Sequence, residues 1–362
     1  MSDKSNISQY RRERKNTMSI LDAQREAHKI AFYPMMFQAI RSMINFGVLS
    51  FLADGKEVTK SDIIGKTKIS DYAAGLLLDV AVYGDIATFN NGKYSITKLG
   101  RFLFEDELIK VNMDFMNDVC YQGAFDLQKS LETGQPEGLK VFGDWETIYQ
   151  GLGNLPSKAH ESWFNFDNYY SDLVFDEAVK IVLRHQPKVV YDVGGNTAKF
   201  DMTLLNANED VRSEIFDLPP QIKKAKITIK SAGLENRVRL NEMDVLDPKS
   251  SFPKGCDAIW MSQFLDCFSP EKIVFILNKL NEAMGDNTRL YILEPFVDKQ
   301  NDVAALALTN ISLYFTCMAN GYSRMYKQYE MEKYLDQAGL KLVDAHQNLG
   351  EYDYTLLECM RK

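Results

Sequence analysis

The chain has 362 residues, of which 45% are hydrophobic, and its formal net charge is -8 at pH 7. This length suits two domains better than one, and the hydrophobic content excludes disorder over most of the chain. The negative charge disfavours broad non-specific binding to nucleic acid or to an anionic membrane, so we expect neither as a partner.

Cysteine and histidine usage gives no sign of a disulfide framework or a metal site. The five cysteines are scattered without a CxxC pair, and the four histidines are dispersed. We therefore expect a reducing compartment and no bound metal. Residues 1–17 lack the apolar core of a signal peptide, and no apolar run of about 18 residues predicts a membrane span. These observations predict a flexible N-terminus and a cytoplasmic protein.

The first long predicted element is a helix over residues 18–52. Apolar side chains recur there at three- and four-residue spacing, and Pro34 must start or kink a helix because it cannot donate the usual backbone hydrogen bond. A crowd of apolar side chains is too hydrophobic for a free surface, so we expect a homodimer through residues 18–60 and parts of 100–170. These side chains are Phe32, Met35, Met36 and Phe37.

Two shorter helices and a hairpin are predicted next. Residues 58–69 predict a helix begun by a threonine or serine cap, and residues 70–82 predict a helix capped by Ser70. Asn91-Gly92 is a hairpin turn signal between two short alternating strands. Three helices and a hairpin are typical of a winged helix. Many winged helices bind DNA, but acidic and basic residues balance here, so a packing or dimer role is favoured over a ligand-sensing regulator.

Beyond this region the pattern becomes helical and aromatic, and then alternates between strand and helix. The dense aromatic side chains of residues 111–185 suit a core, an interface or the wall of a ligand pocket. The later alternation predicts a mostly parallel sheet, closed by a helix and two strands. The strand candidates are KVVYDVGG, SEIFDL, RLNEMDVL, CDAIWMSQ and RLYILEPF. The predicted organisation is a flexible N-terminus at 1–17, a helical and winged-helix domain at 18–110, a helical linker at 111–185 and an α/β domain at 186–362.

A glycine turn follows the first of these strands. The strand Val190–Val193 leads into Gly194-Gly195 and then into a helix. Glycine lets a backbone approach a ligand closely, and a helix N-terminus favours negative charge. The G-x-G-x-x-G pattern of a dinucleotide-binding fold is absent. Asp192, just before the glycines, can orient the loop or reach a cationic ligand.

Acidic residues also follow the next two strands. Asp217, in the sequence FDLP, is placed to accept hydrogen bonds from ribose hydroxyls, and we favour this over a helix-capping role. Asp244 can accept a hydrogen bond from an adenine amino group, with Met243 and Val245 on either side of the ring. A solvated turn explains that last stretch equally well.

The three motifs, their order and their spacing resemble the plant caffeate-type and acetylserotonin-type small-molecule O-methyltransferases and their bacterial relatives, over nearly the whole chain. That family pairs a helical, winged-helix dimerisation domain with a Rossmann-like class I methyltransferase domain built on a mostly parallel seven-stranded sheet. The resemblance implies S-adenosylmethionine as cofactor and S-adenosylhomocysteine as product, with a homodimeric enzyme. It also implies methylation of a hydroxyl or carboxyl on an aromatic or polyketide-like small molecule.

The resemblance assigns a cofactor site residue by residue. The family's DVGGGxG motif matches Asp192–Ala198, with Asn196 and Ala198 in place of two glycines. By this resemblance Gly194 holds the carboxypropyl end of the cofactor and Asp217 holds the ribose. The last position of the site, Ser262, is often lysine in the family. The whole implied cofactor site comprises Asp192, Gly194, Gly195, Asp217, Leu218, Met243, Asp244, Val245 and Ser262.

The catalytic stretch departs from the family's pattern. LHDWSDE in the family aligns with Leu265–Glu271, which places Asp266 where the general-base histidine is expected. Glu294 matches a retained glutamate, whereas the second orienting glutamate falls near Met325. Three possibilities stay open: Asp266 is a buried base, the acceptor is acidic enough to need no strong base, or methyl transfer has been lost. The last would leave a cofactor-binding member with hydroxylase-like or decarboxylase-like chemistry.

The resemblance also implies the walls of an acceptor pocket. They come from the helix before the catalytic domain and the segment before the closing helix, and they comprise Trp163, Phe164, Asn168 and Asn320. Many members carry methionine where this chain has Asn168, so we expect a more polar pocket. Asp266 and Glu294 both follow strands at the carboxyl edge of the sheet, and we expect them to face the acceptor in one cleft.

Overall fold

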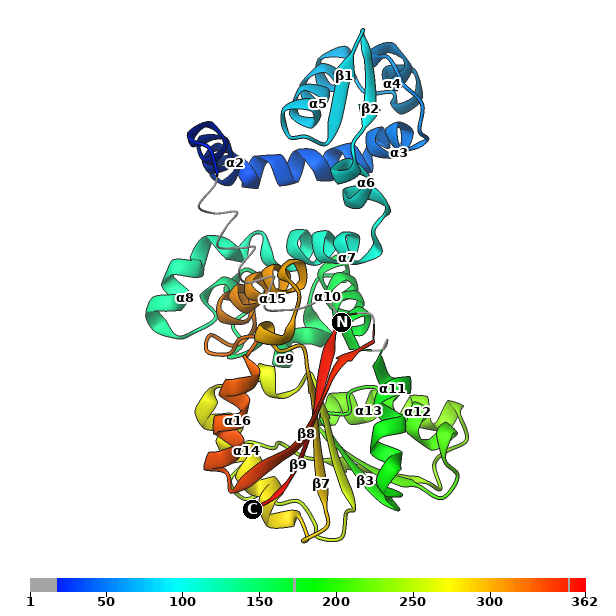
Figure 1. The fold of residues 1–362 in the computed structure, drawn as a ribbon, viewed down its shortest axis with the longest axis vertical. Coiled ribbons are helices and arrows are strands. Elements are labelled where there is room, and N and C mark those ends of the chain that lie inside the picture. Colours follow the sequence, from blue (N-terminus) through cyan, green and yellow to red (C-terminus); the bar gives the residue numbers. More distant parts are fainter. Residues whose placement is uncertain (1–17, 172–173, 351) are drawn as a thin grey trace. The chain divides into compact units, whose positions relative to one another are not determined.

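The structure is a computed structural model that describes residues 18–171, 174–350 and 352–362. The flexible N-terminus predicted at 1–17 lies outside the described residues. The chain divides into two compact units, Met1–Asp114 and Phe115–Lys362, and each is described by itself. Figure 1 labels their helices and strands.

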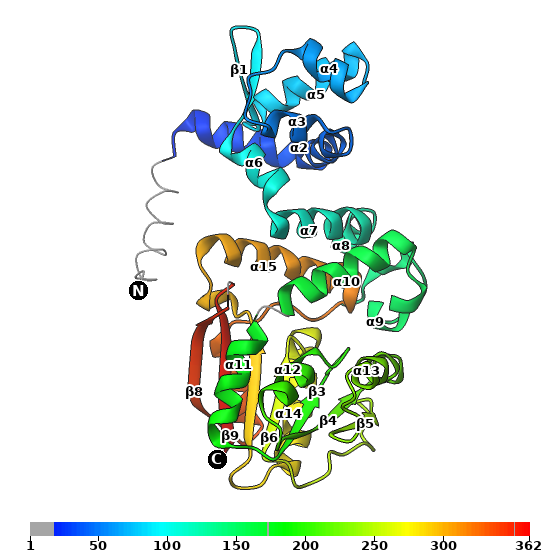
Figure 2. The ribbon, with the colours of Figure 1, turned by 90° about the vertical axis from the view of Figure 1, so that its right-hand side faces the viewer.

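The first unit consists of helices and one hairpin. Pro34 lies inside its first helix, which bends along its length in both ribbon views (Figures 1 and 2), as expected where a proline interrupts the backbone hydrogen bonds. The elements in chain order are α2 (Ile20–Asn45), α3 (Val48–Ala53), α4 (Lys60–Thr67), α5 (Asp71–Tyr83), β1 (Ala87–Asn90), β2 (Lys93–Ile96), α6 (Lys98–Glu105) and α7 (Glu107–Phe115), the last of which crosses into the second unit.

Local sequence signals account for the boundaries of these short elements. Thr59 and Asp62 form a capping box at the start of α4, and the Ser70 hydroxyl accepts a hydrogen bond from the Ala73 amide at the start of α5. β1 and β2 pair antiparallel around Asn91 and Gly92, which both have positive φ. The two predicted helices and the predicted hairpin are therefore confirmed.

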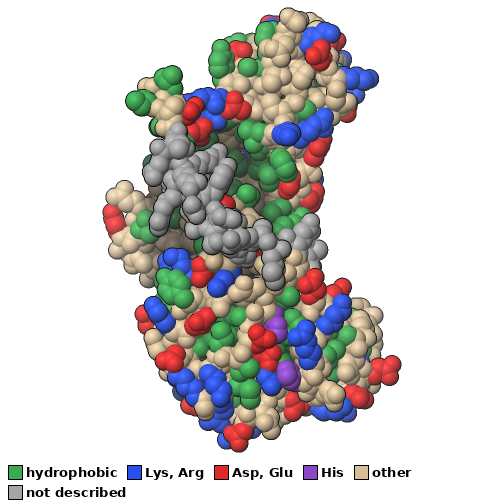
Figure 3. Space-filling model, in the orientation of Figure 1, with side chains coloured by type: hydrophobic (Ala, Val, Ile, Leu, Met, Phe, Trp, Pro, Cys, Tyr) green, Lys and Arg blue, Asp and Glu red, His purple; other side chains and the backbone are tan. Residues whose placement is uncertain are grey.

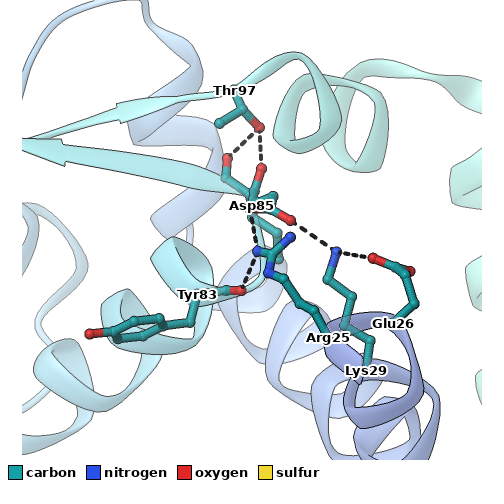
Figure 4. A network of polar contacts seen from close by, with 7 residues as sticks. Arg25, Glu26, Lys29, Tyr83, Asp85 and Thr97 are labelled. Carbon is teal, nitrogen blue, oxygen red and sulfur yellow. Dashed lines mark hydrogen bonds and ion pairs between the residues drawn. The ribbon is translucent and has the colours of Figure 1, made fainter. Parts of the chain in front are cut away.

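A polar network ties the long helix to the loop before the hairpin (Figure 4). Asp85 accepts hydrogen bonds from Arg25 at 2.6 Å and from Lys29 at 2.9 Å, both on α2. These cations hold the pKa of the Asp85 carboxyl down at about 2. The Thr97 hydroxyl donates to the Asp85 carbonyl at 2.6 Å, so the same loop is also fixed from the end of the hairpin.

The second unit begins with helices and continues as an α/β sheet. Its α-helices are α8 (Leu127–Thr133), α9 (Ile148–Gly151), α10 (Ser157–Ser171), α11 (Phe175–Val182), α12 (Lys199–Ala207), α13 (Pro219–Ser231), α14 (Pro270–Ala283), α15 (Asp302–Tyr314) and α16 (Gln328–Gln337). Its strands are β3 (Val189–Val193), β4 (Arg212–Asp217), β5 (Val238–Glu242), β6 (Ala258–Ser262), β7 (Arg289–Glu294), β8 (Leu340–Leu349) and β9 (Tyr354–Arg361).

The seven strands form one sheet in the order β5-β4-β3-β6-β7-β9-β8. β3 to β7 are parallel, and β9 runs antiparallel to both of its neighbours. All five predicted parallel strands and the closing hairpin are present, so the predicted Rossmann-like class I architecture is confirmed. The carboxyl ends of β3 and β6, on either side of the point where the strand order reverses, form the edge where such sheets bind ligands.

Helices cover both faces of this sheet (Figures 1 and 2). One core lies under α14 and α16 and includes Ile276 and Leu335, whereas another lies under α11 and α12. In the second core the Phe200 and Trp260 rings stack with their centroids 3.9 Å apart. Burial on both faces explains why the central strands are nearly continuous apolar runs in the sequence.

One described stretch, Asp302–Ala319, has the length and the apolar composition of a membrane span, and 44% of it is buried inside the protein. It consists of α15 and the π-helical turn that follows. A core helix of a soluble protein meets the same criteria, so this stretch does not by itself indicate a membrane-spanning segment.

Candidate functional site

The glycine turn after β3 packs too closely for any larger residue. Gly194 has φ +81°, and a Cβ there would lie 2.3 Å from the Phe264 ring. A Cβ at Gly195 would lie 2.7 Å from Asp192 Oδ2. Both positions therefore need glycine, for backbone conformation at the first and for close approach at both.

The rest of the loop is held by hydrogen bonds where the family has glycines. Asn196 has φ +46°, and its backbone amide donates to Asp217 Oδ2 at 2.8 Å. Its side chain donates to Asp167 Oδ2 at 3.2 Å, and Lys199 Nζ donates to Asn168 Oδ1 at 2.8 Å. The loop is thus tied both to the end of β4 and to the end of α10.

A polar pocket opens between this loop and the end of β6. Two of its side-chain atoms, Ser262 Oγ and Gln263 Nε2, are buried without a hydrogen-bond partner among the described residues. Buried polar groups are normally satisfied, so these two atoms suit a polar ligand such as S-adenosylmethionine. The lining residues are Asp167, Asn168, Phe175, Asp192, Gly194, Gly195, Asn196, Thr197, Lys199, Phe200, Trp260, Ser262 and Gln263.

The other sequence-predicted cofactor residues lie outside this lining. Asp217 is the last residue of β4, where its two carboxylate oxygens accept hydrogen bonds from the amides of Asn196 and Leu218. Burial raises its pKa to about 6. Asp244 accepts from the Leu246 amide at 2.8 Å within its own turn, and Val245 packs into the sheet core beside Met243. The ribose and adenine roles of these residues stay predictions.

A pair of buried carboxyl groups lies behind the glycine turn. Asp192, at the end of β3, faces Asp201 on α12, and burial together with this neighbour raises the Asp192 pKa well above its usual range. Burial raises the Asp201 pKa to about 6, and Asp201 accepts a hydrogen bond from the Ser213 hydroxyl. Asp201 was not among the predicted site residues, because an acidic residue in the first turn of a helix is common at exposed positions.

Asp266, in the turn after β6, and Glu294, the last residue of β7, come together at the carboxyl edge of the sheet. They line one small pocket together with Met325 and Tyr326. Both carboxyl groups are almost fully buried, at 5% and 3% exposure. The expectation that the two acids share a cleft agrees with this arrangement, whereas their chemical roles stay predictions.

The two acids have different surroundings. Glu294 Oε1 accepts hydrogen bonds from the amides of Phe264 at 3.2 Å and Leu265 at 3.0 Å, while Oε2 is buried without a partner among the described residues. Burial, and then Asp266, raise the Glu294 pKa well above its usual range, which favours its neutral form. Burial raises the Asp266 pKa to about 7, in the range where a base works near neutral pH.

Two of the predicted acceptor residues, Trp163 and Phe164, form an aromatic wall on α10. The indole of Trp163 donates to the Tyr314 hydroxyl at 2.8 Å and is 8% exposed. Phe164 packs edge-on against Trp163, and Lys224 Nζ lies 4.0 Å from the Phe164 ring centroid. Tyr314 was not among the predicted acceptor residues, because it lies 151 positions after Trp163 in the chain and no local pattern links the two.

The two predicted asparagines have other partners. Asn168 lies at the polar pocket beside the glycine loop. The Asn320 amide is buried, where it donates to the Cys267 carbonyl at 3.0 Å and to Ser323 Oγ at 2.7 Å. Asn320 therefore fixes the turn that carries Asp266, and direct contact of either asparagine with an acceptor stays a prediction.

Comparisons with known protein families match one domain in each part of the chain. A Dimerisation2-like domain model matches residues 24–94, and an O-methyltransferase domain model matches residues 156–341. The chain is 24% identical over 314 residues to L-tyrosine C(3)-methyltransferase of Streptomyces lavendulae, covering 86% of this chain and 85% of that protein. It is 24% identical over 315 residues to 2,7-dihydroxy-5-methyl-1-naphthoate 7-O-methyltransferase of Streptomyces carzinostaticus, covering 85% and 90%.

Solved structures show the same fold. The S-adenosylmethionine-dependent methyltransferase SibL superposes with a TM-score of 0.70 at 24% identity, covering 92% of this chain and 98% of that chain. The O-methyltransferase NcsB1, in complex with S-adenosylmethionine and 2-hydroxy-5-methyl naphthoic acid, has a TM-score of 0.65 at 22% identity, covering 91% and 96%. At these identities the likeness establishes the architecture.

Proposed function

Since the chain belongs to the O-methyltransferase domain family, and so to the class I S-adenosylmethionine-dependent methyltransferases, we propose that it methylates a hydroxyl group of a small aromatic molecule. One observation carries the proposal. Asp266 is buried with Glu294 at the carboxyl edge of the sheet, next to the strand whose end lines the polar pocket. A base thus lies beside a site that suits the methyl donor.

Methyl transfer is an in-line displacement in which proximity and orientation supply much of the rate. When bound, S-adenosylmethionine supplies an electrophilic methyl group. On the protein side, Asp266 accepts the proton of the acceptor hydroxyl. The electron pair of that oxygen forms the new O–CH₃ bond as the C–S bond breaks, and S-adenosylhomocysteine is released.

Asp266 suits this step better than a solvated aspartate would. A carboxylate with a pKa near 4 is a weak base for a phenol with a pKa near 10. Burial raises the Asp266 pKa to about 7 and so narrows the mismatch. Glu294 keeps the turn in place through two backbone hydrogen bonds, so the two acids have separate tasks.

The acceptor site is proposed to lie between Asp266 and the aromatic wall of α10. Trp163 is fixed by its hydrogen bond to Tyr314, and Phe164 by its contact with Lys224, so both rings are preorganised for a flat acceptor. Asn320 stabilises the turn that carries Asp266, because its amide donates a hydrogen bond to the Cys267 carbonyl. In this proposal Asn168 faces the boundary between cofactor and acceptor.

A second candidate reaction is methylation of an aromatic carbon next to a phenol. Similarity to an L-tyrosine C(3)-methyltransferase over 86% of this chain favours it. Removal of the phenolic proton by Asp266 would make the neighbouring ring carbon nucleophilic. That carbon forms the C–CH₃ bond as the C–S bond breaks. The resulting dienone loses its ring proton to water, which restores aromaticity, and the phenol oxygen takes back the proton held by Asp266.

One experiment tests both reactions. The full-length protein is titrated calorimetrically with S-adenosylmethionine and S-adenosylhomocysteine, and is then incubated with trideuteromethyl-labelled cofactor and a panel that includes L-tyrosine and dihydroxynaphthoic acids. We expect cofactor binding and a mass gain of 17 on at least one phenol, relative to unreacted acceptor, from replacement of H by CD₃. NMR then locates the label on oxygen or carbon. Absence of cofactor binding by folded protein would overturn the proposal.

We further propose that the first unit makes a homodimer and that its helices and hairpin form a winged helix used for packing. Several large apolar side chains of α2 are exposed, and Figure 3 shows hydrophobic side chains on that end of the unit. On the face drawn there, acidic and basic side chains are interspersed, which argues against a DNA-binding patch. The exposed apolar residues of α2 are Ile20, Leu21, Ile30, Phe32, Tyr33 and Met35.

A cytoplasmic location is supported by the five cysteines, all of which are free thiols.

A further inference from the structure

The residue after Asp266 contacts the same carboxyl group. Leu265–Cys267 form a short 3-10 turn, and the Cys267 thiol donates to Asp266 Oδ1 at 3.5 Å. This hydrogen bond stabilises the charged carboxylate and lowers the Asp266 pKa, against the larger effect of burial. The thiol is thus a donor aimed at the proposed base.

A tyrosine from a distant helix lies against that thiol. Tyr149, on α9, has a buried hydroxyl without a hydrogen-bond partner among the described residues. Burial first, and then the neighbouring Cys267, raise the Tyr149 pKa well above its usual range, so the hydroxyl keeps its proton. Leaving a buried hydroxyl without a hydrogen-bond partner is unfavourable, so we expect a partner at this position in the working site.

Among the described residues, the other titratable side chains near Asp266 are acids or phenols. Glu294 comes from the end of β7, and Asp167 comes from α10. Tyr326 comes from the segment before α16, and its hydroxyl donates to the Phe268 carbonyl at 2.6 Å. None of these groups, nor Tyr149 or Cys267, is a cation. Among these side chains, the Asp266 anion can therefore be stabilised by a neutral hydrogen-bond donor, such as the Cys267 thiol, and not by a positive charge.

The chemistry of the turn fits this arrangement. The family's LHDWSDE stretch has histidine and aspartate where this chain has Asp266 and Cys267. An aspartate beside an aspartate base would place like charges together and disfavour the working anion. Burial, and then Asp266, raise the pKa of the Cys267 thiol well above its usual range, so it remains a donor and is not a nucleophile.

We propose that Cys267 and Tyr149 are positioning residues for the base: the thiol holds one oxygen of Asp266, the phenol holds the thiol, and the rest of the carboxylate is left to the acceptor. This inference rests on the proposed function for its catalytic meaning. The proton of the acceptor hydroxyl still passes to Asp266, while Cys267 and Tyr149 keep their own protons throughout.

The test measures the pKa of the Asp266 carboxyl group, a readout that does not require the protein to turn over an acceptor. Protein labelled with carboxyl-¹³C aspartate is titrated by infrared spectroscopy, and the difference against Asp266→Asn isolates Asp266. Loss of a hydrogen bond to a charged group shifts a pKa by about one unit, so Cys267→Ala is expected to raise the Asp266 titration by about that much. Cys267→Ser keeps a donor and is expected to restore it.

Two more variants complete the experiment. Tyr149→Phe is expected to shift the titration in the same direction by less, and it keeps the test open if Cys267→Ala does not fold. Cys256→Ala, a buried thiol at the far end of β6, is the matched control and is expected to leave the titration unchanged. With an acceptor identified, the acid limb of the kcat/KM profile moves to higher pH in step with the titration.

The outcomes separate this inference from the proposed function. The positioning role would be overturned if Cys267→Ala left the Asp266 pKa unchanged. It would also be overturned if the control Cys256→Ala shifted that pKa by the same amount. A shift in Cys267→Ala, rescue in Cys267→Ser and no methyl transfer to any phenol would support the positioning role and overturn the proposed reaction.

Discussion

Glu294 Oε1 accepts a hydrogen bond from the Leu265 amide at 3.0 Å, which joins the end of β7 to the turn that carries Asp266. The same oxygen also accepts from the Phe264 amide at 3.2 Å. One carboxyl group therefore satisfies two backbone donors that would otherwise have no partner in a buried turn. These two hydrogen bonds hold the turn that carries Asp266, and they are the basis for the positioning role proposed for Glu294.

Two substitutions of Glu294 are expected to distinguish the effect of its hydrogen bonds from the effect of its charge. Glu294→Gln retains an oxygen that accepts from the Phe264 and Leu265 amides, so the melting temperature is expected to stay close to wild type. Glu294→Ala leaves both amides unsatisfied, at about 1–3 kcal/mol each, and is expected to lower both stability and kcat. Thermal melting and steady-state kinetics provide the comparison. Equal loss in both variants would show that the charge, and not the hydrogen bonds, matters.

Removal of the base is expected to slow methyl transfer and change its pH dependence. Asp266→Asn is expected to lower kcat by about 10²–10⁴-fold, the usual worth of general-base catalysis. The Asp266 pKa is raised to about 7, so the working anion forms as pH rises through that value. Wild-type kcat/KM is therefore expected to rise between about pH 6 and 8. A variant with unchanged kinetics would remove Asp266 from the mechanism.

The glycine turn gives a prediction about cofactor affinity. In Gly195→Ala the new Cβ would lie 2.7 Å from both Asp192 Oδ2 and Ile215 Cγ2. Overpacking of this kind costs about 1–3 kcal/mol. The free loop can relieve this strain by leaving its binding conformation, which must then be restored on binding, so the affinity for S-adenosylmethionine is expected to fall by up to roughly 5- to 150-fold. Gly153→Ala is the control, because nothing lies within 4 Å of its Cβ. Calorimetry that shows equal affinities in the two variants would contradict the packing argument.

The buried acids behind the turn predict a pH-dependent stability. Burial raises the Asp201 pKa from 3.8 to about 6, so its stabilising contribution is present below pH 3.8 and is lost as pH rises through 6. The loss is on the order of 3 kcal/mol for a shift of this size. Asp201→Asn is expected to raise the melting temperature at pH 8 and to change it little at pH 4. A variant that is less stable at pH 8 than wild type would contradict this assignment.

The proposed dimer depends on the exposed apolar face of α2. Phe32 and Met35 are 63% and 72% exposed in the single chain. The double variant Phe32→Glu, Met35→Glu is expected to be a monomer by light scattering, because it places charge in an apolar interface. Tyr72→Glu on α5 is the matched control, since that side chain is 78% exposed but lies outside α2. A monomeric wild-type protein at micromolar concentration would refute the proposal.

Much of the fold follows from local sequence signals. Apolar runs such as CDAIWMSQ predict the central strands, because a parallel sheet buries both faces. Ser70 and Asn91-Gly92 predict a helix start and a hairpin turn, because the chemistry of caps and turns is local. The pairing of Asp266 with Glu294 was also predictable, because both follow parallel strands at the same edge.

Contacts between distant segments could not be predicted in the same way. Tyr149 contacts Cys267 across more than a hundred residues, and no periodicity or spacing encodes that approach. Asn320 was predicted to line the acceptor pocket, yet its amide donates a hydrogen bond to the Cys267 carbonyl. A side chain that satisfies the backbone and one that contacts a ligand have the same signature in a sequence.

The bonds from Asn196 to Asp167 and from Lys199 to Asn168 bear on how the enzyme can be divided. They attach the loop after β3 and the start of α12 to α10, which is separated from β3 in the chain by α11. A recombinant fragment that starts at residue 186 would retain every strand and both glycines but lose those two anchors. Minimal versions of this enzyme therefore need to begin before α10 if they are to keep the loop in shape.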